Sequence, residues 1–295
     1  MAKHDFCVAC PVGGDFNDND QTCSISDPGD ELPLTCVGPW AEDKHARVRK
    51  YVDISRAVRK KFVTGKGGAT YIDLFCGPGR ARIRGTNQII DGSCLVAAKE
   101  AISGGTAFSE VYVADVNKSF ADAARARLKQ IGISAHKYTG PAESTVQKIA
   151  EKIGSFGLHF AFLDPYDLKS LPFSLVQRLA KFERMDMLIH VSAQDLQRNL
   201  RRYIQSERSP LDSFAPGWRD AVDPMSSDLD VRIKIFSYWL GLIRAEDMRT
   251  SQGVEKVTGT KSQHLYWLVF VARHDLALKF WNDIRNVTNQ TSFGF

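Results

Sequence analysis

The 295-residue chain contains no apolar run long enough to span a bilayer, and its start, Met-Ala-Lys-His-Asp, lacks the pattern of a signal peptide. It also lacks a strong charge of either sign, because its formal net charge is +5. A charge of that size permits a polyanionic partner such as nucleic acid without demanding one. Internal repeats and low-complexity tracts are absent as well. We expect a cytoplasmic protein with no membrane partner.

Cysteine is scarce and unevenly placed. Four of the six cysteines, Cys7, Cys10, Cys23 and Cys36, fall at the start of the chain, and a reducing cytoplasm does not favour disulfides between them. Cys7 and Cys10 form a Cys-x-x-Cys pair, which Cys23 and Cys36 could complete as four thiolate ligands of zinc or of an iron–sulfur cluster. The second pair lacks the tight spacing of the first, so plain free cysteines in a loose arm are the alternative.

The composition changes along the chain. Residues 11–39 are rich in Gly, Asp, Asn, Pro and Ser, which favours an irregular arm over packed secondary structure. We therefore divide the chain into a cysteine-containing arm, residues 1–37, and one α/β domain, residues 38–295. With 43% hydrophobic residues, the chain can bury a large core.

Short apolar runs alternate with helical patterns through most of the domain. This order predicts a mostly parallel, seven-stranded sheet joined by right-handed crossovers, with an antiparallel strand at the C-terminal end. Pro, Asp, Trp and charged residues interrupt the alternation over about residues 199–249, where we predict a helical insertion. The predicted strands cover residues 70–75, 111–114, 134–138, 158–163, 185–191, 254–260 and 264–272, and the predicted helices cover 41–62, 93–102, 118–130, 142–153, 174–182 and 274–285, with one more after Gln194.

The predicted helix over 41–62 has one apolar face and one basic face. Most of the basic residues are expected to be solvated. Its end, Arg59-Lys60-Lys61, is either part of that solvated face or a surface that follows phosphates.

The most informative segment runs from Thr70 to Arg80. It reads Thr-Tyr-Ile-Asp-Leu-Phe-Cys-Gly-Pro-Gly-Arg, a strand that leads into an Asp-x-Phe-x-Gly-x-Gly turn. Glycine suits a turn that lets backbone approach a bulky cofactor, because it has no Cβ and adopts positive φ. A dinucleotide fingerprint needs a third glycine where Arg82 stands, and no Gly-Lys-Ser/Thr of a phosphate loop follows. The candidate cofactor residues of this turn are Asp73, Phe75, Gly77 and Gly79.

A second motif, Asp164-Pro165-Tyr166, follows the predicted strand over 158–163. Ligands of open α/β sheets sit beyond the carboxyl ends of the strands, so this motif and the glycine turn are expected to converge on one crevice. A carboxylate and a proline-side carbonyl can both accept from an exocyclic amine, which favours a tetrahedral nitrogen with its lone pair exposed. The tyrosine ring can stack on an extruded base. The alternative is a turn-capping Asp with ordinary turn and core neighbours.

Two further carboxylates stand near expected strand ends. Asp115 ends the predicted second strand, where a carboxylate suits both hydroxyls of a ribose. Glu143 follows the third strand, where it either helps to frame an adenine or only stabilises a helix N-terminus.

The remaining polar candidates have ordinary explanations beside them. Arg82 and Arg84 fall in a predicted loop over 80–91, where they either contact substrate phosphates or are solvated. The histidines in or beside predicted strands, His159, His190 and His264, are interpreted as structural, because hydrogen-bonded strand histidines are commoner than catalytic ones.

These motifs carry a family resemblance. The glycine turn resembles the cofactor loop of class I S-adenosylmethionine-dependent methyltransferases, and Asp164-Pro165-Tyr166 resembles the Asp/Asn-Pro-Pro-Tyr/Phe motif of amino methyltransferases with one proline missing. Gly38-Pro39-Trp40-Ala41-x-x-Lys44-His45, the two motifs and Tyr266–Phe270 together look like the three-Cys-motif partner proteins over about residues 38–285. The namesake cysteines belong to a gene-neighbour protein, so the name does not explain the cysteines of the arm. The resemblance implies a Rossmann-like class I methyltransferase fold.

Motifs and resemblance together predict a methyltransferase that uses S-adenosylmethionine and acts on an amino group, most naturally on a nucleic-acid base, DNA or RNA. Asp164, Pro165 and Tyr166 would act on the target, and Asp73, Phe75, Gly77, Gly79, Asp115 and Glu143 would bind the cofactor. One alternative is a catalytically weak scaffold that binds a three-cysteine-motif partner protein. Another is a methyltransferase for a protein or a small molecule.

Overall fold

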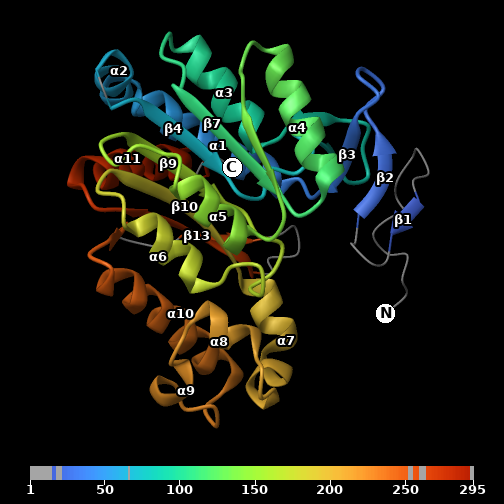
Figure 1. The fold of residues 1–295 in the computed structure, drawn as a ribbon. Helices are drawn as coiled ribbons and strands as arrows, with labels where there is room; N and C mark the ends of the chain where they lie inside the picture. Colours follow the sequence, from blue (N-terminus) through green and yellow to red (C-terminus); the bar gives the residue numbers. More distant parts are fainter. Residues whose placement is uncertain (1–14, 18–21, 66, 252–254, 259–263, 293–295) are drawn as a thin grey trace. The chain divides into compact units, whose positions relative to one another are not determined.

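The computed structural model describes residues 15–17, 22–65, 67–251, 255–258 and 264–292. Its chain forms two compact units of mixed α/β structure, residues 1–140 and residues 141–295 (Figure 1). This division falls elsewhere than the expected border between an arm and a domain at residue 38, which stays a prediction.

The first unit contains a parallel sheet whose order is β4-β7-β8. Its strand β4 is buried along its whole length, as expected for a parallel strand that is covered on both faces. Helix α4 packs against β7 and β8, and it begins where the Asn117 side chain accepts from the backbone N–H of Ser119. The elements are β4 (Ala69–Asp73), β7 (Glu110–Asp115), β8 (His136–Thr139), α3 (Ser93–Ser103) and α4 (Lys118–Gln130).

A second sheet of the first unit was not predicted. It has the order β1-β2-β3-β5-β6, in which β3 pairs in parallel with β5. Strand β3 belongs to the region that the composition favours as an irregular arm, and β5 and β6 replace the predicted loop over 80–91, in which Arg82 is buried rather than solvated. Those two predictions were wrong. The strands are β1 (Asp15–Asn17), β2 (Thr22–Ser26), β3 (Pro33–Val37), β5 (Arg80–Ile83) and β6 (Ile89–Asp91).

The predicted helix over 41–62 is two helices, α1 (Trp40–Ile54) and α2 (Arg56–Thr64), which meet at Ser55. Arg59 explains the break, because its side chain turns inward and donates to the carbonyls of Val52 and Thr106. Burial lowers the pKa of Arg59 to about 10. Arg59 therefore cannot follow phosphates, whereas Lys60 and Lys61 are exposed.

The second unit contains the parallel pair β9 and β10, and β13 runs antiparallel to β10. Strands β11 and β12 also pair antiparallel with β13, so the antiparallel C-terminal end predicted from the sequence is confirmed. Helices α7 and α11 pack against β13. The elements are β9 (Leu158–Leu163), β10 (Met185–Ser192), β11 (Arg249–Thr250), β12 (Glu255–Thr258), β13 (His264–Ala272), α5 (Ala142–Ala150), α6 (Phe173–Ala180), α7 (Ala193–Gln205) and α11 (Asp275–Ser292).

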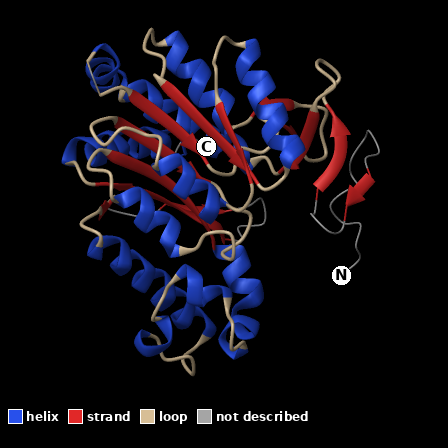
Figure 2. Ribbon diagram, in the orientation of Figure 1, coloured by secondary structure: helices blue, strands red, loops and turns tan. Residues whose placement is uncertain are grey.

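The insertion is helical, as predicted. Figure 2 shows its helices α8 (Pro210–Phe214), α9 (Trp218–Ala221) and α10 (Asp228–Ala245) as a group without strands between them. Stacked aromatic rings stabilise the insertion. The Trp239 ring stacks with the rings of Phe214 and Phe236, and the Phe236 ring also stacks with that of Trp267 in β13. Within the described part of the chain, no helix is both long and apolar enough to cross a membrane.

Candidate functional site

The glycine turn begins where β4 ends at Asp73. Gly77 and Gly79 have φ values of 53° and 85°, so both use the left-handed region that favours glycine. A Cβ on Gly77 would meet nothing within 4 Å, whereas a Cβ on Gly79 would lie 3.2 Å from the Ala124 Cα of α4. The two glycines therefore have different tasks: Gly79 allows a helix to pack closely, and Gly77 leaves open space in which a ligand can approach the backbone.

Asp73 is fully buried, and its carboxylate accepts hydrogen bonds from other groups of the chain. Its carboxylate accepts from the hydroxyl of Ser93 at 2.6 Å, from the hydroxyl of Tyr71 at 3.2 Å and from the backbone N–H of Phe75 at 3.3 Å. Ser93 opens helix α3, so one carboxylate joins the strand, the start of the turn and a helix. Of the predicted cofactor residues, Asp73 thus supports the turn, and Phe75 is half-buried within it.

Asp115 holds the other side of the turn. One of its oxygens accepts from the backbone N–H of Gly77 at 3.0 Å and the other from that of Asn117 at 2.8 Å. The backbone N–H of Cys76 also donates to the carbonyl of Ala114, at 3.0 Å. Burial raises the pKa of Asp115, and the backbone N–H groups oppose that shift. The structure therefore brings Asp115 and Gly77 together, as expected for two parts of one site.

In the second unit, the Asp164-Pro165-Tyr166 motif follows β9. Asp164 Oδ1 lies 3.3 Å from His190 Nδ1, and the Pro165 carbonyl oxygen lies 3.2 Å from the same nitrogen. The two acceptors assigned to a target amine thus converge on one ring nitrogen. The Tyr166 side chain is 72% exposed, so its ring is open to solvent rather than part of the core.

Sequence reasoning missed His190 as a site residue. Parallel pairing places Ile189 of β10 beside Leu163 of β9, so the next residues along the two strands, His190 and Asp164, are neighbours. The ring of Tyr266 packs edge-on against the His190 ring, with 4.3 Å between the ring centres. The register of two expected parallel strands was the signal that could have found this pair.

Asp195 is a second residue that sequence reasoning missed. It stands in the first turn of α7, and its carboxylate accepts from the backbone N–H of Leu168 at 3.0 Å. The hydroxyl of Tyr203 donates to the same carboxylate, and burial together with Asp195 raises the pKa of Tyr203 to about 12. Asp195 therefore ties the end of the loop that carries Asp164 to α7.

Glu143 has a local partner. It lies exposed in the first turn of α5 and accepts from the hydroxyl of Ser174 on α6. That contact joins two helices. Its predicted place beside an adenine stays a prediction, and so does the convergence of the glycine turn and the Asp164 motif on one crevice, because the two motifs belong to different units.

The predicted cysteine site falls mostly outside the described residues. Cys7 and Cys10 lie outside them, and only the backbone of Cys23 is described. Cys36 lies in β3, half-buried against the apolar pair Ile25 and Leu34. No group of three or more potential metal ligands occurs among the described side chains, and a metal at the four cysteines stays a prediction.

Comparisons with known proteins give structural similarities only. No protein-family model and no curated protein matches the chain. Among solved structures, it is similar to an O-methyltransferase from Bacillus cereus in complex with SAH, at 16% identity over 83% of this chain and 86% of that chain, with a TM-score of 0.44. It is also similar to an rRNA methylase from Streptococcus thermophilus, at 11% identity over 78% of this chain and 93% of that chain, with a TM-score of 0.38. At such TM-scores, neither similarity establishes a family or an activity for this chain.

Proposed function

We propose that the chain is an S-adenosylmethionine-dependent methyltransferase. The observation that carries this proposal is the glycine turn, in which Gly77 combines a left-handed backbone, open space at its Cβ position and an N–H held by Asp115. A carboxylate has about four acceptor sites. Asp115 uses two of them for backbone N–H groups, so further lone pairs can accept from ribose hydroxyls. The residues of the turn therefore fit the proposed cofactor.

Bound S-adenosylmethionine would supply a methyl group activated by its sulfonium sulfur. The turn around Gly77 would bind and orient it, with Asp115 fixing its ribose. An amine acceptor has to lose a proton, which needs acceptor groups beside it.

Asp164 and Pro165 are the acceptor groups that we assign to the target amine. His190 fixes this pair, since its Nδ1 lies within 3.3 Å of both acceptor oxygens. A carboxylate has acceptor sites for more than one donor, so positioning by His190 and amine binding are compatible. Tyr166, exposed beside them, would stack on a flat target.

A nucleic-acid base is the target class that we favour. The exposed Tyr166 ring supports a flat acceptor, and Arg198 and Arg202 are exposed on α7, the helix tied by Asp195 to the motif loop. The insertion as a whole carries eight Lys and Arg residues and eight Asp and Glu residues over 199–249, so its formal net charge is zero. The resemblance to three-Cys-motif partner proteins is part of the same proposal and leaves the substrate open.

Cofactor binding is tested by replacing Gly77 with alanine. Gly77→Ala places a Cβ in the open space and strains a left-handed backbone, so we expect the dissociation constant for S-adenosylmethionine to rise at least tenfold. The matched control is Gly132→Ala, because Gly132 has a φ of 82° and an equally open Cβ position. Both variants should lose about 1 kcal/mol of stability. Isothermal titration should give wild-type affinity for the control, and wild-type affinity for Gly77→Ala would contradict the site.

Chemistry is tested by transfer of labelled methyl groups into separate DNA, RNA and protein pools. Asp164→Ala should keep cofactor affinity and lose at least a hundredfold in transfer rate, in the range that a positioned acid–base group contributes. Asp167→Ala removes a carboxylate of the same loop that accepts from Ser170 instead, and it should stay active. Label in a nucleic-acid pool that disappears in Asp164→Ala supports an amino methyltransferase of nucleic acid. Unchanged turnover in that variant would remove Asp164 from the mechanism.

A scaffold without catalysis is the second candidate, and two observations favour it. His190 already engages the two acceptors that an amine would use, and the missing proline shortens the motif. A scaffold of this kind would bind a three-cysteine-motif protein and show no affinity for S-adenosylmethionine in the titration above. Measurable affinity without label in any pool would indicate an enzyme for a small molecule, or one that needs its partner.

A further inference from the structure

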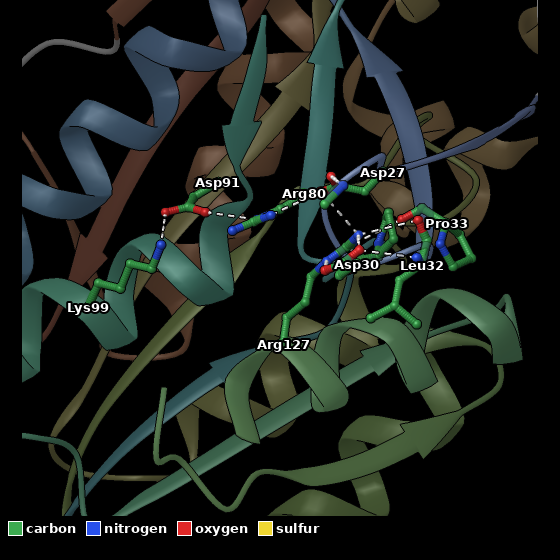
Figure 3. Close-up of polar contacts among 10 residues, drawn as sticks. Asp27, Asp30, Leu32, Pro33, Arg80, Asp91, Lys99 and Arg127 are labelled. Carbon is green, nitrogen blue, oxygen red and sulfur yellow. Dashed lines mark hydrogen bonds and ion pairs between the residues drawn. The ribbon is translucent and has the colours of Figure 1, made fainter. Parts of the chain in front are cut away.

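Arg127 is a buried charge that neither motif includes. It projects from α4 with only 1% of its side chain exposed, at the centre of the polar cluster in Figure 3. Its Nε and Nη2 donate to the two carboxylate oxygens of Asp30, each at 2.8 Å. This is the bidentate geometry in which a guanidinium binds a carboxylate most strongly and most specifically. Asp30 lies in the connection between β2 and β3.

The same guanidinium also reaches the glycine turn. Its Nη1 donates to the carbonyl of Pro78 at 2.7 Å and to that of Pro33 at 2.8 Å. Pro78 stands between Gly77 and Gly79, so this bond fixes the peptide group that precedes Gly79. One side chain therefore connects the β2–β3 connection directly to the backbone of the turn.

A second arginine, Arg80, extends the network of ion pairs directly after Gly79. Arg80 donates from Nη1 to Asp27 at 3.0 Å, and its Nε lies 3.5 Å from a carboxylate oxygen of Asp91 (Figure 3). Lys99 of α3 completes the chain of charges by donating to Asp91. Asp27 and Asp30 thus hold the turn through two arginines, one on each side of Gly79.

The burial of Arg127 makes this connection strong. A buried guanidinium has to keep its partners, because an unpaired charge in the interior is costly. When Arg127 is held by Asp30, its Nη1 has a fixed position, and the Pro78 carbonyl follows it. The order of the turn then depends on residues 27–33, which the composition places in an irregular arm.

We propose that Arg127 is a positioning residue, which acts through the Pro78 carbonyl to hold the Gly77–Gly79 turn in the form that binds S-adenosylmethionine. Residues 27–33 then support the cofactor site indirectly, through Arg127. The inference rests on the proposed function for its ligand, whereas the effect on the turn itself can be measured without any ligand.

The test compares two buried arginines. Arg127→Lys keeps the charge and loses the planar, bidentate geometry. Arg59→Lys makes the same change at an arginine that is also 1% exposed and bound to backbone carbonyls, but of Val52 and Thr106. Hydrogen exchange of the peptide covering residues 74–80 is measured in the cofactor-free proteins, and cofactor affinity is then measured by titration. Thermal unfolding of each variant records the general loss of stability.

We expect faster exchange of the turn in Arg127→Lys only, and a roughly tenfold weaker affinity for S-adenosylmethionine, the loss typical of one hydrogen bond to a charged group. Asp30→Asn should give the same pattern more weakly, and it replaces Arg127→Lys if that variant does not fold. The inference would be overturned if the turn exchanged hydrogen at the same rate in Arg127→Lys, Asp30→Asn and wild type. It would also be overturned if Arg59→Lys accelerated the exchange of the turn as Arg127→Lys does. If wild type binds no cofactor, the proposed function fails, and the exchange data still decide whether Arg127 positions the turn.

Discussion

At the scale of single residues, the candidate motifs of each unit contain carboxylates that bind their own chain. Asp73 holds Ser93, Asp115 holds the N–H of Gly77, and Asp164 engages His190. Side chains fixed in this way keep their position before a ligand arrives, which is what a preorganised site requires. Sequence reasoning found all three by their places at strand ends. It did not identify Ser93 or His190 as partners, because strand register and tertiary packing set those contacts.

Asp30 gives a prediction about pH. Its hydrogen bonds to Arg127 hold the pKa of Asp30 below its ordinary value. A carboxyl group whose pKa is lowered by folding contributes stability at pH values above its unfolded pKa, and that contribution disappears as the pH falls through the folded pKa. At neutral pH, we expect Asp30→Asn to unfold with a free energy about 2 kcal/mol below that of wild type.

This difference should shrink as the pH falls below the ordinary aspartate pKa of about 3.9. Urea unfolding of both proteins, from neutral pH down to the lowest pH at which both still fold, measures the difference. If the difference in unfolding free energy stayed constant over the whole pH range, the charge of Asp30 would contribute nothing to stability.

At the scale of elements, apolar patterns and polar segments differed in how well they could be predicted. Strands β4 and β9 consist mostly of apolar and aromatic residues, and their predicted and observed bounds agree to within two residues. Strand β3 and the hairpin of β5 and β6 contain charged and turn-forming residues, and their pairing depends on contacts with residues distant in sequence. Local composition does not contain that information.

The break between α1 and α2 was also not predicted, because it too depends on contacts between residues distant in sequence. No proline or glycine marks Ser55, so the apolar period predicts one continuous helix. The break comes with the burial of Arg59, whose guanidinium donates to the carbonyls of Val52 in α1 and of Thr106, and lies 4.9 Å from the centre of the Phe108 ring. An arginine at a helical position is normally exposed. Its burial here is decided by partners that the sequence places far apart.

At the scale of the whole molecule, the first unit depends on its N-terminal residues. Strand β3 pairs with β5, Ile25 and Leu34 form an apolar cluster, and Asp30 neutralises Arg127. An independent arm would contribute none of this. The structure therefore assigns residues 25–37 a role in the stability of the unit that also contains the glycine turn.

Removal of residues 1–37 should therefore destabilise the protein strongly. The truncated protein would bury Arg127 without its carboxylate partner, which costs about 3–5 kcal/mol. We expect the melting temperature to fall by roughly 10 °C. Arg127→Met in the truncated protein should recover part of this loss, because an apolar side chain of similar length needs no partner, whereas in the intact protein the same substitution should destabilise by leaving Asp30 unpaired. Calorimetry of the four proteins tests this opposite response. A truncated protein that melts at the same temperature as the intact one would contradict this role of residues 25–37.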